Sequence, residues 1–198
     1  MEEIEFKVKY GGAEKYKVID YCLDNGYEYQ GASVQRDIYL TPSHRNITDD
    51  DEAIRVRYDS GAGKWALTYK GRNKSRAFHD REELETAVGN GEALLAILAR
   101  LDFKVILEIE KTRETYSSDS YSICLDEVKG LGTYLEIEYL SSENGINREK
   151  IKDEMEAAIA GIGLDDYRYE SRNYLYLLME QLMKQNKQNN KEGEHNGY

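Results

Sequence analysis

Apolar and polar residues alternate along much of this chain, beginning with EIEFKVK over residues 3–9. There Ile4, Phe6 and Val8 alternate with charged residues, which is the pattern of a β-strand with two unlike faces. Similar stretches predict further strands over residues 35–40, 53–59, 64–70, 81–86, 104–116, 121–128 and 130–140. SGAG, from Ser60 to Gly63, reads as the turn of a hairpin. The pattern favours a domain dominated by antiparallel strands.

Helical patterns lie between these strands. Val18, Ile19 and Cys22 would form the buried stripe of a short first helix, and residues 92–101 give the clearest apolar helix. Residues 148–163 and 167–184 read as two more helices, the last one packed through its tyrosines, Tyr174 among them. From Gln185 on the sequence is polar and low in complexity, which predicts disorder. We therefore expect one α+β domain over residues 1–184 and a disordered polar tail over residues 185–198.

Composition narrows the possible partners. The chain has 198 residues, 33% of them charged, and a formal net charge of −11, which argues against nucleic acid or an anionic membrane as a main partner. Its two cysteines, Cys22 and Cys124, lack metal-ligand spacing. No apolar run approaches the roughly 20 residues that span a bilayer. We expect a cytoplasmic protein, and the sequence leaves a homodimer open.

The charged residues of the predicted strands gather on single faces. These faces hold Glu3, Glu5, Lys7 and Lys9, then Arg55 and Arg57, Lys70, Arg81 with Glu83 and Glu85, Asp126, and Glu136 with Glu138. The strand over residues 104–116 differs, because Lys111 and Arg113 fall in register with Leu107 and Ile109. A strand that passes from a packed end into a polar interior would show this pattern.

For any single strand, a charged face usually meets water. Several such strands together with amphipathic helices favour another arrangement, in which the helices cover the apolar faces and the charges point into a barrel. Buried charges are costly without partners. Paired carboxylates suit Mg²⁺ or Mn²⁺, and arginines and lysines suit phosphate oxygens. The residues alone thus point to a site for a highly charged anion with divalent metals.

In this context, Glu3-x-Glu5-x-Lys7 resembles the ExExK signature of the CYTH family, the class IV adenylyl cyclases and thiamine triphosphatases, also called triphosphate tunnel metalloenzymes. The resemblance continues in order through Arg55-x-Arg57, Lys70, Glu83-x-Glu85, Lys111-x-Arg113, Asp126 and Glu136-x-Glu138, and ends in the segment RNYLYLL. It covers residues 2 to about 180. It implies a closed eight-stranded antiparallel β-barrel, the triphosphate tunnel, with helices packed outside.

The resemblance also implies roles for single residues. Phosphates would be held by Lys7, Arg55, Arg57, Lys70, Lys111 and Arg113, with Arg81 as a further contact. Metal would be coordinated, directly or through water, by Glu3, Glu5, Asp126, Glu136 and Glu138. Further tunnel-lining residues would be Asp37, Glu83, Glu85 and, at a tunnel mouth, Lys9. The residues expected to act in catalysis are Lys7, Arg55, Arg57, Lys111, Glu136 and Glu138.

The activity is open between two reactions. Gln35, Asp37, Tyr39 and Arg45 match the cyclase-like branch, whose characterised members carry a His-Phe pair ahead of ExExK, where this sequence has Met1-Glu2. We therefore expect hydrolysis of inorganic triphosphate or another short triphosphate, with class IV adenylyl cyclase activity on ATP as the alternative. A non-catalytic sensor of polyphosphate or nucleotide is a second alternative. The expected partner in each case is a small molecule that contains a triphosphate or polyphosphate.

Overall fold

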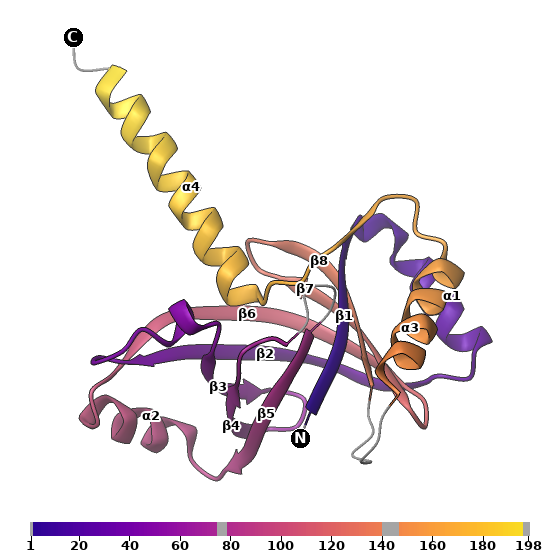
Figure 1. Cartoon of the computed structure of the whole chain (residues 1–198), viewed down its shortest axis with the longest axis horizontal. Coiled ribbons are helices and arrows are strands. Elements are labelled where there is room, and N and C mark those ends of the chain that lie inside the picture. Colours follow the sequence, from indigo (N-terminus) through magenta and orange to yellow (C-terminus); the bar gives the residue numbers. More distant parts are fainter. Residues whose placement is uncertain (1, 75–78, 140–146, 196–198) are drawn as a thin grey trace.

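The computed structural model describes residues 2–74, 79–139 and 147–195. The strands are β1 (Glu2–Tyr10), β2 (Glu28–Pro42), β3 (Ala53–Asp59), β4 (Lys64–Lys70), β5 (His79–Val88), β6 (Phe103–Ser117), β7 (Tyr121–Val128), β8 (Gly132–Tyr139) and β9 (Tyr167–Tyr169). The helices are α1 (Lys15–Asp24), α2 (Gly91–Arg100), α3 (Arg148–Ile162) and α4 (Tyr174–His195), with short 3₁₀ turns η1 (Gly12–Glu14) and η2 (Ile47–Asp50). This is the expected α+β fold, with a large antiparallel sheet and few helices (Figure 1).

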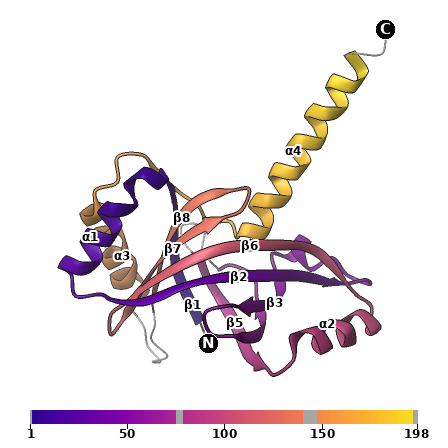
Figure 2. The ribbon, with the colours of Figure 1, turned by 180° about the vertical axis from the view of Figure 1, so that it is seen from behind.

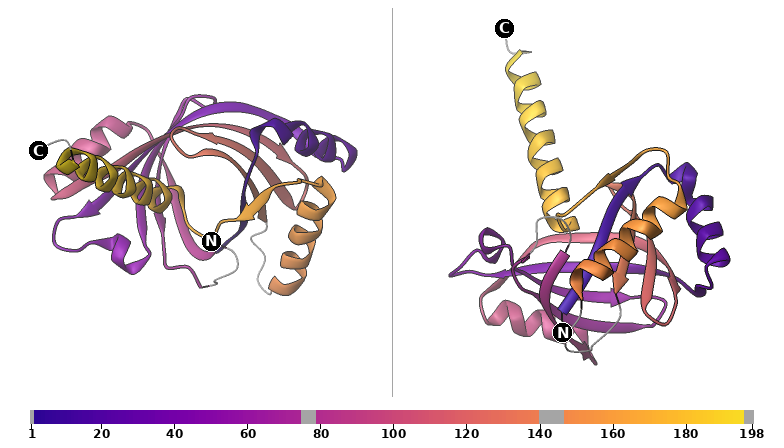
Figure 3. Two further views of the ribbon diagram at one scale, coloured as in Figure 1. Left: turned by 90° about the horizontal axis from the view of Figure 1, so that it is seen from above. Right: turned by 45° about the vertical axis from the view of Figure 1, so that its right-hand side comes forward.

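The nine strands form one sheet in the order β5-β4-β3-β2-β6-β7-β8-β1-β9, with a further pairing between β5 and β1. The N-terminal half of β1 pairs with β5, in a register that includes Glu3 opposite Arg81, and its C-terminal half pairs with β9. Residues 5–9 of β1 also pair with β8. Seen from above and from behind, the strands curve around a common interior (Figures 2 and 3).

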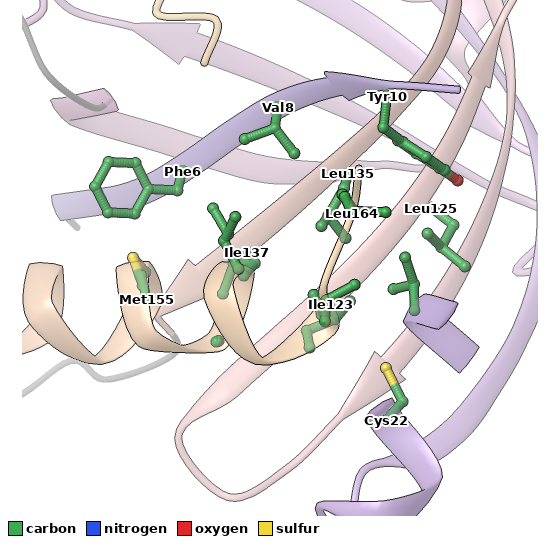
Figure 4. Packing of buried hydrophobic residues seen from close by; sticks show 14 of the residues in the cluster. Phe6, Val8, Tyr10, Cys22, Ile123, Leu125, Leu135, Ile137, Met155 and Leu164 are labelled. Atoms are coloured by element: carbon green, nitrogen blue, oxygen red, sulfur yellow. The ribbon is translucent and has the colours of Figure 1, made fainter. Parts of the chain in front are cut away.

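The main apolar core lies outside the curved sheet, between β1, β7 and β8 and the helices α1 and α3. Ile4, Phe6 and Val8 are at most 2% exposed and belong to a cluster that includes Met155 of α3 and Cys22 of α1. Figure 4 shows Phe6 and Val8 of β1 beside Ile137 and Leu135 of β8, with Met155 below them. The alternation of the sequence thus places the apolar half of β1 on the helix side.

Two other helices cover other parts of the sheet. Leu94, Leu95 and Leu98 of α2 pack against a smaller cluster that contains Ile38 and Val56. The first turns of α4 pack on a third cluster, and the rest of the helix projects away from the sheet (Figure 1). Among the described residues, none of the helices combines the length and the apolar character that crossing a bilayer requires.

The C-terminal region differs from the sequence prediction at two points. Residues 167–169 form β9 rather than helix, because they pair with residues 8–10 of β1. The helix begins only at Tyr174, where the side chain of Asn173 accepts a hydrogen bond from the Tyr176 backbone amide. The helix then runs to His195 and so includes residues 185–195 of the polar tail. These residues contain Lys, Gln and Glu, which are good helix formers, and no proline. The ninth strand is likewise an addition to the eight expected.

Candidate functional site

A cavity of about 750 Å³ opens on the concave face of the sheet. Most of the residues predicted to bind phosphate or metal lie in its wall: Glu5, Lys7, Arg55, Arg57, Lys70, Arg81, Lys111, Arg113, Glu136 and Glu138. Glu83 and Glu85, predicted as further tunnel-lining residues, lie there too. Glu5 and Lys7 are each only 4% exposed. The charged face of β1 is therefore turned into the molecule and away from bulk water, as the sequence predicts.

Strand register explains how distant parts of the chain meet here. Glu5 lies opposite Glu138 and Lys7 opposite Glu136 in the β1–β8 pair. In the same way Arg113 lies opposite Asp126 in the β6–β7 pair. Since side chains directly opposite each other project from the same face of a sheet, these pairings gather the charges on the concave side.

Glu5, Glu136 and Glu138 form a group of carboxylates suited to a metal ion. One carboxylate oxygen from each of them lies within 4.8 Å of the others. Burial and the neighbouring carboxylates of Glu5 and Glu136 raise the pKa of Glu138, although Arg113 opposes the shift. Three acidic groups at this spacing repel one another, and a divalent cation with oxygen ligands would relieve the repulsion.

Two cations pair with this carboxylate group. Arg113 pairs with Glu136 and, at 3.3 Å, with Glu138. Nζ of Lys7 lies 3.1 Å from Glu5 and 3.2 Å from Glu136. Burial alone would lower the pKa of Lys7, but these two carboxylates outweigh it and raise the pKa above the ordinary value. Lys7 is thus charged over the whole physiological pH range.

Asp126 lies behind the cavity wall and binds two cations. Its carboxylate accepts hydrogen bonds from Lys111 Nζ at 2.6 Å and from Nε and one terminal nitrogen of Arg113, each at 2.7 Å. Burial opposes its ionisation, but Arg113 and Lys111 hold the pKa of Asp126 well below its usual range. Burial and Arg113 together lower the pKa of Lys111 despite this pairing. Asp126, expected as a metal ligand, is therefore placed here as a partner of cations.

Asp37 is arranged in the same way on the other side of the cavity. It is 1% exposed and accepts two hydrogen bonds from Arg57, at 2.6 and 2.7 Å, while Arg55 lies 3.7 Å away. Burial raises its pKa, but Arg57 and Arg55 outweigh burial and keep it well below the ordinary value. Asp37 thus helps to fix Arg57 and Arg55, two residues predicted to bind phosphate.

The acids of β5 also face cations in the cavity. Glu83 pairs with Lys70 at 2.9 Å, and Glu85 accepts a hydrogen bond from Thr68 at 2.7 Å and lies 3.6 Å from Arg55. In this position they balance the charge of the cationic wall. These contacts give the two predicted tunnel-lining acids cationic or hydroxyl partners within the wall.

Besides Asp37 and Asp126, which lie behind the cavity wall, two more of the predicted site residues are not placed in it. Lys9 is exposed, and its Nζ donates to the backbone oxygen of Leu131 at 2.9 Å. The side chain of Glu3 lies outside the described residues, although its backbone belongs to β1.

Sequence reasoning missed several residues of the wall. Tyr39, Asn173 and Tyr174 also line the cavity. Tyr174 was expected only to pack the last helix, yet its hydroxyl donates to Asp126 at 2.9 Å. The signal available in the sequence was its position in RNYLYLL, within the segment that resembles the family.

Comparison with known proteins identifies the family to which this chain belongs. A family model described as "CYTH domain" matches residues 1–174. A protein of Methanocaldococcus jannaschii named "Putative adenylate cyclase MJ0240" is 32% identical over 89% of this chain and 98% of its own length. The solved structure of PH1819 protein from Pyrococcus horikoshii OT3 has a TM-score of 0.77 and 31% identity, and the match covers 90% of this chain and 99% of that one.

A more distant solved structure shares the fold. Its description reads "Putative adenylyl cyclase HpAC1 from Hippeastrum reveals a dominant triphophatase activity". It has a TM-score of 0.70 at 18% identity, and the match covers 90% of this chain and 96% of that one.

Proposed function

Since this chain belongs to the CYTH domain family, whose members act as triphosphate tunnel enzymes, we propose that it hydrolyses inorganic triphosphate or another short triphosphate with the help of Mg²⁺ or Mn²⁺. The observation that carries the proposal is the cavity wall. It combines several buried cations with a separate group of carboxylates, Glu5, Glu136 and Glu138. Anion binding alone would need only the cations.

The proposal includes a closed eight-stranded tunnel. The pairing of β1 with both β8 and β5 supports closure, because those strands stand at opposite ends of the series β5-β4-β3-β2-β6-β7-β8. A closed tunnel would exclude much of the bulk solvent, and electrostatic interactions are stronger where water is excluded.

Each part of the wall has a task in this reaction. Arg55, Arg57, Lys111 and Arg113 bind and orient the phosphate oxygens, and arginine can do so with two parallel hydrogen bonds. Glu5, Glu136 and Glu138 would hold the metal ion, since all three offer oxygen ligands. When bound, the ion supplies charge neutralisation and an activated water. The fixed cations stabilise the negative charge that develops as the phosphoanhydride bond breaks.

Adenylyl cyclase activity is the second candidate. The cavity volume of about 750 Å³ is within the range of small-molecule sites and leaves room for a nucleoside next to three phosphates. The names of the Methanocaldococcus relative and of the Hippeastrum protein refer to cyclase activity, and the latter also to triphosphatase activity. The same cations would serve either reaction, because the pose of the substrate selects the phosphorus that is attacked.

A product assay separates these possibilities. Purified protein would be incubated with Mg²⁺ or Mn²⁺ and either inorganic triphosphate or ATP, and the products separated by chromatography. Orthophosphate released chiefly from inorganic triphosphate supports the proposal, whereas cyclic AMP with pyrophosphate supports the cyclase. Tight binding without any product would contradict both and favour a sensor.

A further inference from the structure

Tyr174, the first residue of α4, joins two cations that come from different strands. Its ring centroid lies 4.5 Å from Nζ of Lys7 in β1 and 5.0 Å from Nζ of Lys111 in β6. Two strands, β7 and β8, separate β1 from β6 in the sheet order. One aromatic side chain thus contacts both ammonium groups from the end of the cavity where α4 begins.

The hydroxyl of Tyr174 contacts a third charged group. It donates to Oδ2 of Asp126 at 2.9 Å, the same oxygen that accepts the hydrogen bond of Lys111. The residue itself is 5% exposed. Next to it, the backbone oxygen of Arg172 lies 3.4 Å from Lys7 Nζ and accepts a hydrogen bond from it. The start of α4 therefore contacts Lys7 in two ways.

The fold fixes the position of this ring. Leu175 and Leu177 are buried in the cluster under α4, and Tyr176 donates a hydrogen bond to the backbone oxygen of Thr48. The ring of Tyr134 meets that of Tyr174 edge-on, with centroids 5.1 Å apart. Tyr174 consequently has little freedom to move without its neighbours.

We propose that Tyr174 is a positioning residue for the cationic wall: its ring holds the ammonium groups of Lys7 and Lys111, and its hydroxyl orients Asp126 beneath Lys111. The negative face of an aromatic ring attracts cations but carries no net charge. The ring can thus hold two like charges near each other without adding a negative charge to those of Glu5, Glu136 and Asp126, which already pair with them. A phosphate chain would then compete only with these carboxylates for the two cations. This use of the cations rests on the proposed function, whereas the positioning itself does not.

Two variants separate the ring from the hydroxyl. Tyr174→Phe keeps the ring and loses the hydrogen bond to Asp126, while Tyr174→Leu loses both. Tyr121→Phe is the matched control, because it removes a phenol hydroxyl that donates to Glu154 on the helix side of the sheet, outside the cavity wall. The ligand is inorganic triphosphate with Mg²⁺, and the measurements are its Kd by calorimetry and the kcat and KM of orthophosphate release.

We expect Tyr174→Leu to raise Kd by roughly 10-fold, in line with the loss of two buried cation–π contacts. Tyr174→Phe should bind within about 3-fold of wild type but lose roughly 10-fold in kcat, because Lys111 and Asp126 are less well fixed in the transition state. Wild-type Kd and kcat in both variants would overturn the proposal. If Tyr174→Leu fails to fold, the kcat of Tyr174→Phe decides.

A second measurement needs no ligand. The ring should shift the NMR signals of the ε-methylene protons of Lys7 and Lys111, and the shifts should persist in Tyr174→Phe and vanish in Tyr174→Leu. Unshifted signals in the wild type would refute the positioning role. If the shifts are present but wild-type protein neither binds nor cleaves triphosphate, the proposed function fails while the positioning role stands.

Discussion

Asp37 and Asp126 perform the same task at two places behind the cavity wall. Each is at most 1% exposed, and each accepts hydrogen bonds from a guanidinium group that points its charge toward the cavity. A cation held in this way does not have to be ordered by the substrate. This preorganisation is the property that makes fixed charges effective in catalysis.

Substitution of Asp37 by Asn should therefore destabilise the fold. It leaves Arg57 without the carboxylate that accepts two of its hydrogen bonds and removes one of the carboxylates beside the buried Arg55. Breaking a buried pair typically costs about 3–5 kcal/mol of unfolding free energy. Urea unfolding measures this loss. In Glu108→Gln, which breaks the exposed pair with Arg36, the change should stay within about 1 kcal/mol.

The same variant gives a test of pH dependence. The pKa of Asp37 is lowered in the folded state, so its contribution to stability is present above its unfolded pKa of about 4 and is lost as pH falls below that value. Between pH 7 and about pH 5 the difference in unfolding free energy between wild type and Asp37→Asn should be constant, and it should shrink steadily as pH falls from about 4 to about 3, towards the much lower folded-state pKa. Parallel curves would show that Asp37 does not titrate as a stabilised carboxylate.

Lys111→Ala and Glu136→Gln should each abolish turnover and leave the fold intact. The first removes a cation from the wall and the second a member of the carboxylate group, and we expect losses of at least about 100-fold in kcat. Circular dichroism checks the fold. Lys129→Ala is the matched control, because Lys129 is exposed and pairs with Glu110 at 3.3 Å, outside the cavity wall. Near-normal rates in either variant would show that the cavity is not the active site.

At this scale the sequence predicts the charged face but not the task of each acid. The alternation of apolar and polar residues predicts that Glu5, Asp126 and Glu136 lie on the charged face of the sheet, and the strand register agrees. It could not separate Asp126, which holds cations, from Glu5 and Glu136, which project toward each other. That difference depends on side-chain length and on neighbours across the sheet, and strand alternation contains neither.

At the scale of elements, the contact between α2 and the β3–β4 hairpin gives a sharp test. Gly91 begins α2, and a Cβ atom there would lie 2.0 Å from the ring of Trp65 in β4. Gly→Ala in a helix usually stabilises. Here the clash should reverse the sign, so that Gly91→Ala costs about 1–3 kcal/mol.

The control for this change lies two residues away. A Cβ atom at Gly89 would meet nothing within 4 Å, so Gly89→Ala should leave stability nearly unchanged. Trp65 is the only tryptophan of the chain, and its fluorescence reports unfolding directly. Equal midpoints for the two variants in urea would contradict this packing.

Elements with strong periodicity were predictable, and elements formed by long-range pairing were not. Strands β3 and β4 and helix α2 lie within a residue of their predicted bounds. The first part of β2, residues 28–34, has no clear alternation and becomes a strand because it pairs with β6 along its whole length. In the same way β9 exists only beside β1. Tertiary context overrides local preference at both places.

At the scale of the whole molecule, the net charge of the chain is negative, whereas cationic side chains gather in the cavity. The chain carries a net charge of −11, yet its cavity is lined by Lys7, Arg55, Arg57, Lys70, Arg81, Lys111 and Arg113. The acidic exterior repels polyanions, and the cavity attracts them. A divalent cation bound to a triphosphate would lower the charge of the incoming ligand, so we expect binding to depend on metal.

Thermal unfolding tests this dependence. Bound ligand stabilises the folded state by mass action, by about 2.7 kcal/mol at a free concentration of 100 Kd, which for a chain of this size corresponds to roughly 5–10 °C in Tm. We expect inorganic triphosphate with Mg²⁺ to raise Tm by this order and either component alone to raise it less. An excess of EDTA should reverse the combined shift. The absence of any shift would argue for a barrel whose charges only neutralise one another.

Glu138→Gln identifies the metal site within this measurement. Removing one of three carboxylates that repel one another should raise the Tm of the ligand-free protein, because burial, Glu5 and Glu136 all disfavour the charge of Glu138. The change costs Arg113 its contact with Glu138 at 3.3 Å, but Arg113 keeps its hydrogen bonds to Asp126 and Glu136. The same change should weaken the stabilisation by Mg²⁺, since one ligand is lost. The two effects have opposite signs, so a general loss of stability cannot imitate them. A variant that starts at a lower Tm and still responds to Mg²⁺ like wild type would place the metal elsewhere.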